Sequence, residues 1–92
     1  MSRLSGLYGE KAHNFAAIAV GANASTDITV PGAGLGDFAF ASTDKNLAGL
    51  VLSANVSSSD TVTITLSNNT SSSKDPSSTA MYFVKVVKKE DL

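Results

Sequence analysis

The stretch from Gly32 to Leu66 constrains the fold more than any other part of the chain. It contains three short apolar or alternating runs, separated by Gly, Asn, Ser and Asp residues that are typical of turns. In the last run, Thr61 to Leu66, threonine alternates without a fault with Val, Ile and Leu. A period of two places each residue type on one face of a β-strand. The stretch therefore predicts three successive strands, the last two joined in a hairpin.

Further strands are predicted on both sides of this stretch. Alternation predicts strands at Ser25–Val30 and Thr79–Val87. The run Asn14–Val20 is interpreted as a strand, because Gly21 ends it too early for a typical helix. Six to seven strands without a helix predict an all-β fold, namely a small antiparallel β-sandwich or jelly-roll-like barrel. We expect one domain over residues 14–92, preceded by an N-terminal arm at residues 1–13.

Two apolar clusters indicate where the core should lie. Phe38 and Phe40 share one face of the strand Asp37–Ala41, and as the largest apolar pair we expect them to anchor the core. The run Leu47–Val56 is apolar on both faces around Leu50–Leu52, which is typical of a strand covered on both sides.

The last predicted strand suggests an interface. Tyr82, Val84 and Val86 share one face, whereas Met81 and Phe83 share the other. Because both faces are apolar, we expect one to pack on a second sheet and the other on a partner. The twelve-residue polar segment Ser67–Ser78 that precedes this strand is either disordered, an exposed tip or a flap that contacts a neighbour.

The segment 1–13 allows two interpretations. It is either a disordered terminus or an arm that becomes ordered against a partner through Leu4, Leu7 and Tyr8. Both remain open from the sequence. The candidate residues for a capsid or subunit interface are Arg3, Leu4, Leu7, Tyr8, Lys11, His13, Met81 and Phe83.

Composition argues against several classes of function. The 92 residues carry 7 Lys and Arg against 8 Asp and Glu, so no net positive field favours nucleic acid or anionic membranes. No cysteine is present, and a single histidine argues against a metal site or another cofactor. The longest apolar run, Phe15–Val20, is too short to span a membrane. Because small domains without disulfides or metals commonly rely on association, we expect an oligomer. The N-terminus lacks the apolar core of a signal peptide, so we expect synthesis in a cytosol.

No residue pattern supports catalysis. The only histidine, His13, has just Glu10 near it in sequence, and the aspartates occur in or beside predicted turns. The glycines at 32, 34 and 36 have the wrong spacing for a dinucleotide loop and precede a strand, which indicates a turn. The cluster of Lys85, Lys88 and Lys89, offset by Glu90 and Asp91, is interpreted as a solvated tail and not as a patch that binds nucleic acid. By elimination, the chain is expected to be a binding or structural protein and not an enzyme.

Several turn and strand motifs are shared with a known group of proteins. They are Gly36-Asp37, Ala48-Gly49-Leu50-Val51, Asp60-Thr61-Val62-Thr63, Asn68-Asn69-Thr70, Asp75-Pro76 and Met81-Tyr82-Phe83-Val84. With these motifs the chain resembles small β-sandwich virion structural proteins of tailed bacteriophages, most of all capsid decoration (cement) proteins.

This resemblance implies a function on the outer capsid surface of a virion. The implied partners are the major capsid protein and further copies of the chain in a homotrimer, made in the host cytoplasm. The alternative is a tail or head-fibre module that binds a host glycan or receptor through its loops. A stand-alone carbohydrate-binding or adhesin domain is a third possibility, against which the absence of tryptophan and of a signal-peptide pattern argues.

Overall fold

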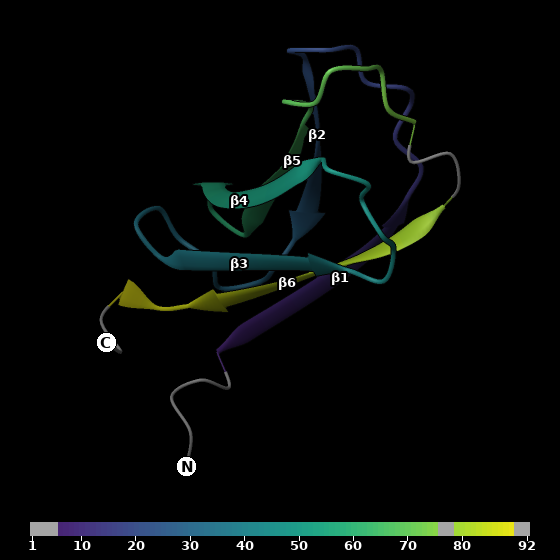
Figure 1. The fold of residues 1–92 in the computed structure, drawn as a ribbon. Coiled ribbons are helices and arrows are strands. Elements are labelled where there is room, and N and C mark those ends of the chain that lie inside the picture. The colour runs from purple at the N-terminus through teal and green to yellow at the C-terminus, as the bar shows by residue number, and fades with distance from the viewer. Residues whose placement is uncertain (1–5, 76–78, 90–92) are drawn as a thin grey trace.

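The computed structural model of the protein describes residues 6–75 and 79–89, and over these residues the fold is an all-β sandwich. Two three-stranded antiparallel sheets face each other (Figure 1). The sheet with strand order β1-β6-β3 is called the β6 sheet here, and the sheet with order β2-β5-β4 the β5 sheet. The strands are β1 (Leu7–His13), β2 (Asn23–Thr29), β3 (Phe38–Thr43), β4 (Val51–Ser58), β5 (Thr61–Ser67) and β6 (Ala80–Val87).

The alternation in β5 sets the inner face of its sheet as predicted. Val62, Ile64 and Leu66 are each 0% exposed. The threonines between them lie on the outer face and are only partly buried. The predicted hairpin with β4 is confirmed, and Asp60 takes a left-handed conformation (φ 62°) at its turn. Fully burying each of these apolar side chains contributes about 1.5–3 kcal/mol to the free energy of folding.

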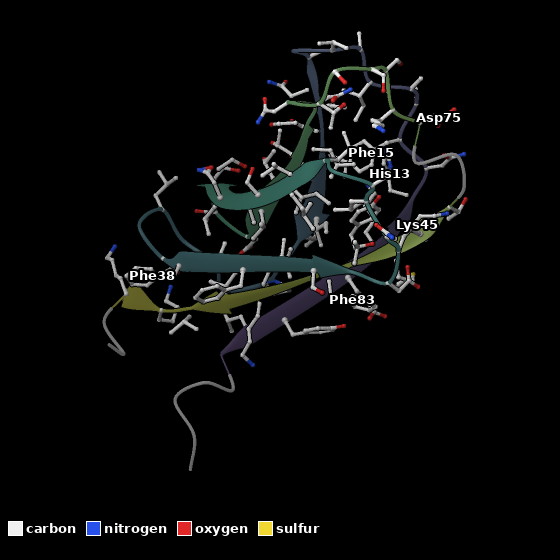
Figure 2. All side chains as sticks on the ribbon, in the orientation of Figure 1. His13, Phe15, Phe38, Lys45, Asp75 and Phe83 are labelled. Atoms are coloured by element: carbon white, nitrogen blue, oxygen red, sulfur yellow. The ribbon has the colours of Figure 1, made fainter. Side chains whose placement is uncertain are left out.

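The inner face of the β6 sheet follows the prediction for its central strand. Tyr82, Val84 and Val86 are buried and pack against the apolar side chains of the β5 sheet. β6 pairs with β1 on one side and with β3 on the other. Figure 2 shows that the side chains fill the space between the two layers, where Phe15 lies.

Residues 7–13 form a strand of the sandwich, which corrects the expectation of an arm. β1 pairs with β6 along its whole length, from Leu7 opposite Val86 to His13 opposite Ala80. Gly9 allows β1 to pack closely against the residues at the end of β2, because a Cβ atom there would lie 2.7 Å from Val30 Cγ2. The central position of β6 explains the pairing, since its backbone groups require a partner on each side. Arg3 and Leu4 lie outside the described residues.

The segment 14–20 is not the strand that was predicted. Only Ile18 pairs with another residue, in an isolated antiparallel bridge to Lys74. Phe15 and Ile18 are nevertheless 3% exposed, so their apolar character serves the core. The segment connects β1 in one sheet with β2 in the other, and a chain that changes layers cannot keep a ladder in either.

The expected burial of Phe38 and Phe40 is wrong. These side chains are 46% and 59% exposed, and Ala39 and Ala41 are the β3 residues that pack against the core. Because side chains alternate along a strand, the choice of inner face assigns all of them at once. β3 approaches β4 of the other sheet at the edge of the sandwich. The side chains on the inner side of β3 at this approach are small.

The predicted burial of β4 on both faces is also wrong. Val51 is 50% exposed, whereas Leu52 and Val56 point inward. β4 is an edge strand of the β5 sheet, and only one of its faces meets the other layer. Leu47–Leu50, predicted as part of the strand, instead form a turn closed by the Leu50 N–H donating to the Leu47 carbonyl over 3.1 Å.

The described part of the 67–78 segment is held in place by one buried side chain. Asn68 is 0% exposed, and its Nδ2 donates to the carbonyl oxygens of Ile18 (2.8 Å) and Ser72 (3.0 Å). Its Oδ1 accepts the Thr70 N–H over 2.9 Å. Residues 68–75 therefore close one end of the sandwich, which argues against their disorder. Residues 76–78 lie outside the described part of the chain.

Candidate protein-binding surface

The outer face of the β6 sheet carries an unusual set of large apolar side chains. Alternate residues of its three strands point away from the β5 sheet, and the burial pattern of each strand shows which ones they are. This outer face is called the aromatic face here. Its residues are Tyr8, Glu10, Ala12, Phe38, Phe40, Ser42, Met81, Phe83 and Lys85.

A groove runs over this face. It has a volume of about 310 Å³ and is lined by Tyr8, Phe40 and Phe83, with Ser42 and Lys85 as polar neighbours. Tyr8 on β1 and Phe40 on β3 are 55% and 59% exposed, and both lie opposite Lys85 on the central strand. The two rings therefore flank the central strand on either side. Grooves lined by aromatic side chains with a few polar groups are typical of binding sites.

One hydrogen bond orders the groove at its β1 side. The Tyr8 hydroxyl donates to Glu10 Oε1 over 2.7 Å. Because the proton is held by a carboxylate, the pKa of Tyr8 is raised above its ordinary value. The pair keeps the Tyr8 ring positioned next to the groove and offers a carboxylate to a bound partner.

The outer face of the β5 sheet is chemically different. It presents hydroxyl groups in rows that are bonded to one another, and it is called the hydroxyl face here. Ser25 Oγ and Thr65 Oγ1 lie 2.9 Å apart on neighbouring strands. The Thr63 hydroxyl is bonded to Asp27 Oδ1 over 2.7 Å and to Ser57 Oγ over 2.7 Å. These groups already have partners, and the face offers little apolar surface.

Three of the predicted interface residues come together on the aromatic face, namely Tyr8, Met81 and Phe83. Sequence reasoning missed Phe40, which it placed in the core. The alternation of Phe and Ala in β3 was the available signal, but it shows only that the two phenylalanines share a face.

The other described candidates do not reach this face. Leu7 packs against the core, and Lys11 Nζ donates to Thr26 Oγ1 (2.7 Å) and to the Asp27 carbonyl (3.1 Å). Lys11 thus bridges the two sheets at the side where β1 meets β2. Its long side chain thus contributes to the fold, and its assignment as an interface residue stays a prediction.

His13 also points into the sandwich. Its ring packs edge-on against Phe15 at a centroid distance of 4.5 Å, and Phe15 contacts Tyr82 in the same manner at 5.4 Å. Figure 2 labels His13 beside Phe15 between the layers. Burial, with a contribution from the charge of Lys11, lowers the pKa of His13 below its ordinary value. The stack seals the end of the sandwich at which β1 finishes.

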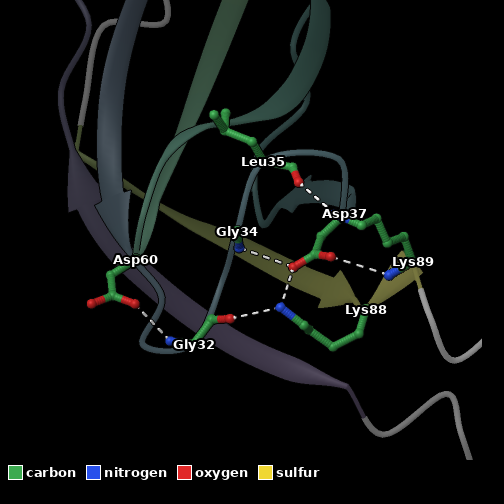
Figure 3. Close-up of polar contacts among 7 residues, drawn as sticks. All are labelled: Gly32, Gly34, Leu35, Asp37, Asp60, Lys88 and Lys89. Carbon is green, nitrogen blue, oxygen red and sulfur yellow. Dashed lines mark hydrogen bonds and ion pairs between the residues drawn. The ribbon is translucent and has the colours of Figure 1, made fainter.

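Lys88 and Lys89 close the opposite end and are not the solvated tail that was predicted. The Asp37 side chain is 1% exposed and forms an ion pair with Lys88 Nζ over 2.7 Å (Figure 3). It also accepts the backbone N–H groups of Gly34 (2.9 Å) and Lys89 (3.1 Å). The bond to Lys88 is the main reason that the pKa of Asp37 is lowered to about 2. This group of contacts is called the C-terminal clasp here.

The glycine-rich segment is the turn that its spacing predicted. Its N–H groups bind the chain's own carboxylates, since Gly32 donates to Asp60 Oδ1 over 2.8 Å and Gly34 to Asp37. The predicted role of these two aspartates in turns is confirmed. The donors that a phosphate would need are thereby already used.

We also searched the described part of the chain for a metal site, a membrane span and further cavities. Among residues 6–75 and 79–89, no three side chains of His, Asp or Glu are grouped so that they could hold a metal ion. Within the same residues no helix is long and apolar enough to cross a membrane. A small cavity of about 170 Å³ lies between the turn at Lys45–Leu50 and residues Lys74 and Asp75.

Comparison with known proteins identifies no relative. No family model, no curated protein and no solved structure matches the chain.

Proposed function

We propose that this protein is a capsid decoration (cement) protein, which binds the outside of a phage head shell at capsomer junctions and stabilises it. The observation that carries the proposal is the aromatic face. It supports binding to another protein, because monomeric proteins rarely expose a continuous patch of large apolar side chains without a partner. The identity of the partner, the major capsid protein, comes from the resemblance of the sequence motifs.

The aromatic side chains are suited to a protein interface. Tyr and Phe are enriched in the buried centres of interfaces, where they form most of the energetically important contacts. Tyr8 and Phe40 are more than half exposed, so a partner that covers them removes much apolar surface from water. At about 25 cal/mol per Å², a covered area of 100 Å² favours binding by about 2.5 kcal/mol. Many copies on one shell add their contributions to its stability.

Binding through the face is favoured over pairing at the β1 and β2 edges. Gly9 on β1 approaches the backbone of Thr29 on β2 closely enough that an added Cβ would lie 2.8 Å from its carbonyl oxygen. The Asp27 carbonyl oxygen on β2 already accepts a hydrogen bond from Lys11 Nζ. A foreign strand would have to displace these contacts. The shell protein therefore binds on the aromatic face, with Arg3 and Leu4 as further candidate contacts.

The test mixes purified protein with shells that lack it and measures the bound copy number and the melting temperature of the shell. We expect hundreds of copies and a higher melting temperature. Phe40→Ser should raise the dissociation constant for the shell at least tenfold, which corresponds to a loss of about 1.4 kcal/mol per site. Val51→Ser is the matched control, because Val51 is 50% exposed on the hydroxyl face and should bind normally. A few copies at one vertex, or equal effects of both variants, would contradict the proposal.

The alternative function is a tail or head-fibre module that binds a glycan or receptor through its loops. The cavity between Lys45–Leu50 and Lys74–Asp75 is the observation in its favour, since it lies at a loop end and has both polar and apolar lining residues. If this alternative holds, Lys74→Ala should weaken attachment to host cells while Phe40→Ser leaves it unchanged.

A further inference from the structure

We infer that in the free protein the aromatic face is covered by the same face of a second copy, related by a twofold axis. An aromatic groove exposed to water favours burial, and an identical chain is the one partner present wherever the protein is made. A twofold contact uses the same patch on both chains, so the patch must be complementary to itself. The charges of the aromatic face meet that requirement.

Glu10 and Lys85 are the two charged side chains of the face as the described strands form it, one of each sign. Lys85 lies opposite Tyr8 in the ladder and Glu10 opposite Phe83, so the two charges occupy neighbouring rows of adjacent strands. Such diagonal positions are about 7–8 Å apart. A twofold axis that lies in the face, midway between the two charges and perpendicular to the line joining them, exchanges their positions. Each Glu10 is then placed over Lys85 of the other copy, and the contact contains two identical ion pairs.

The same axis brings the aromatic rings together. The pairs Tyr8–Lys85 and Glu10–Phe83 form the four corners of a rectangle on the sheet. Glu10 and Lys85 lie at the ends of one diagonal. Tyr8 and Phe83 lie at the ends of the other diagonal, which runs close to the axis. Each therefore meets its own counterpart in the second copy. Aromatic pairs in offset or edge-to-face contact favour association beyond the area that they bury. Phe40 lies farther from the axis and packs over Met81 or Ala12 of the second copy.

The size of the face sets the strength of this dimer. Three strands about 4.8 Å apart and about 24 Å long offer roughly 300 Å² of sheet surface. Stable interfaces bury about 800 Å² on each partner. The dimer is therefore weak and reversible, and it can exchange the second copy for a larger partner surface. The dimer itself does not depend on the proposed function, whereas this exchange with a capsid shell does.

Charge reversal tests the inference in the purified protein without any shell. Sedimentation velocity over a range of protein concentrations gives the dimer dissociation constant. Glu10→Lys and Lys85→Glu should each weaken the dimer at least tenfold, because each places like charges opposite one another. An equimolar mixture of the two variants should restore association, since every charge then meets its opposite on the other chain. Thermal melts and circular dichroism of each variant confirm that it is folded.

The mixture distinguishes contacts between copies from contacts within one chain. If the two side chains acted only inside one molecule, mixing two separately folded variants would restore nothing, and the inference would be overturned. A wild-type protein that is monomeric at millimolar concentration would overturn it as well, and so would the homotrimer that the resemblance implies. A dimer that behaves as expected while shells remain unbound would instead refute the proposed function alone, because the two measurements share no component except the protein.

Discussion

The two outer faces of this sandwich have the same architecture and opposite chemistry. Each is the solvent side of a three-stranded antiparallel sheet. The aromatic face places Tyr8 and Phe40 in water, whereas the hydroxyl face presents Thr63 and Thr65, bonded to polar neighbours on adjacent strands. The hydroxyl groups have hydrogen-bond partners within the chain. The exposed rings, in contrast, lose their contact with water only when another molecule covers them. The hydroxyl face is thus adapted to water, and the aromatic face is the one that we propose a partner covers.

The core beneath the two faces should dominate stability, and its loss is the largest expected effect. Ile64→Ala removes a 0% exposed side chain between the layers and should lower the free energy of unfolding by about 2–5 kcal/mol. Thr65→Ala, one residue further on the hydroxyl face, should cost only about 0.5–1.5 kcal/mol, the usual net contribution of one hydrogen bond. Urea unfolding measures both. Similar losses would mean that the hydroxyl face contributes to folding as much as the core does.

The C-terminal clasp makes the protein sensitive to acid. The folded state lowers the pKa of the Asp37 carboxyl to about 2, below its ordinary value of 3.8. The unfolded chain therefore takes up a proton first as the pH falls, so the stabilisation is complete above about pH 4 and is lost between about pH 4 and pH 2. Asp37→Asn should lower stability at pH 7 and flatten this part of the pH profile of unfolding.

Asp27→Asn is the control for the clasp, because it changes a carboxylate on the hydroxyl face and leaves Asp37 in place. It should retain the acid dependence between pH 4 and pH 2. If the two variants had the same profile, the clasp would not be the origin of the acid sensitivity.

A smaller effect of pH is expected at the other end of the β6 sheet. His13 has a lowered pKa because it packs against Phe15, so the folded state favours the neutral ring. Protonation below the ordinary pKa of 6.5 then favours the unfolded chain, and stability should fall slightly from pH 7 to pH 5. Urea midpoints at the two pH values should converge in His13→Phe, which keeps an aromatic ring without the titration. A midpoint difference that persists in the variant would assign the effect to another group.

Local patterns allowed much of the fold to be predicted. The unbroken alternation in Thr61–Leu66 identified a strand, its two faces and its hairpin, because threonine and aliphatic residues have clearly different affinities for water. The same reasoning identified β6 and the turn at the glycines. It failed for residues 7–13, whose strand is stabilised by pairing with β6, a segment at the other end of the chain.

The candidate site was only partly predictable. Tyr8, Met81 and Phe83 were selected from the sequence, but nothing local shows that β1 and β6 are neighbours and that these side chains share one surface. Phe40 was assigned to the core because large apolar side chains usually lie there. The error concerned a single choice, the direction in which β3 faces.

The sequence by itself determined strands β2 to β6 and the residues that share each of their faces, since both follow from a period of two that short-range sterics impose. Where both faces of a strand are apolar, as in β3, the tertiary structure alone decided which face is inside. That choice depends on which strands become neighbours and on how much space lies between the layers. In β3 the space admitted the two alanines and left the two phenylalanines outside, and this arrangement created the aromatic face.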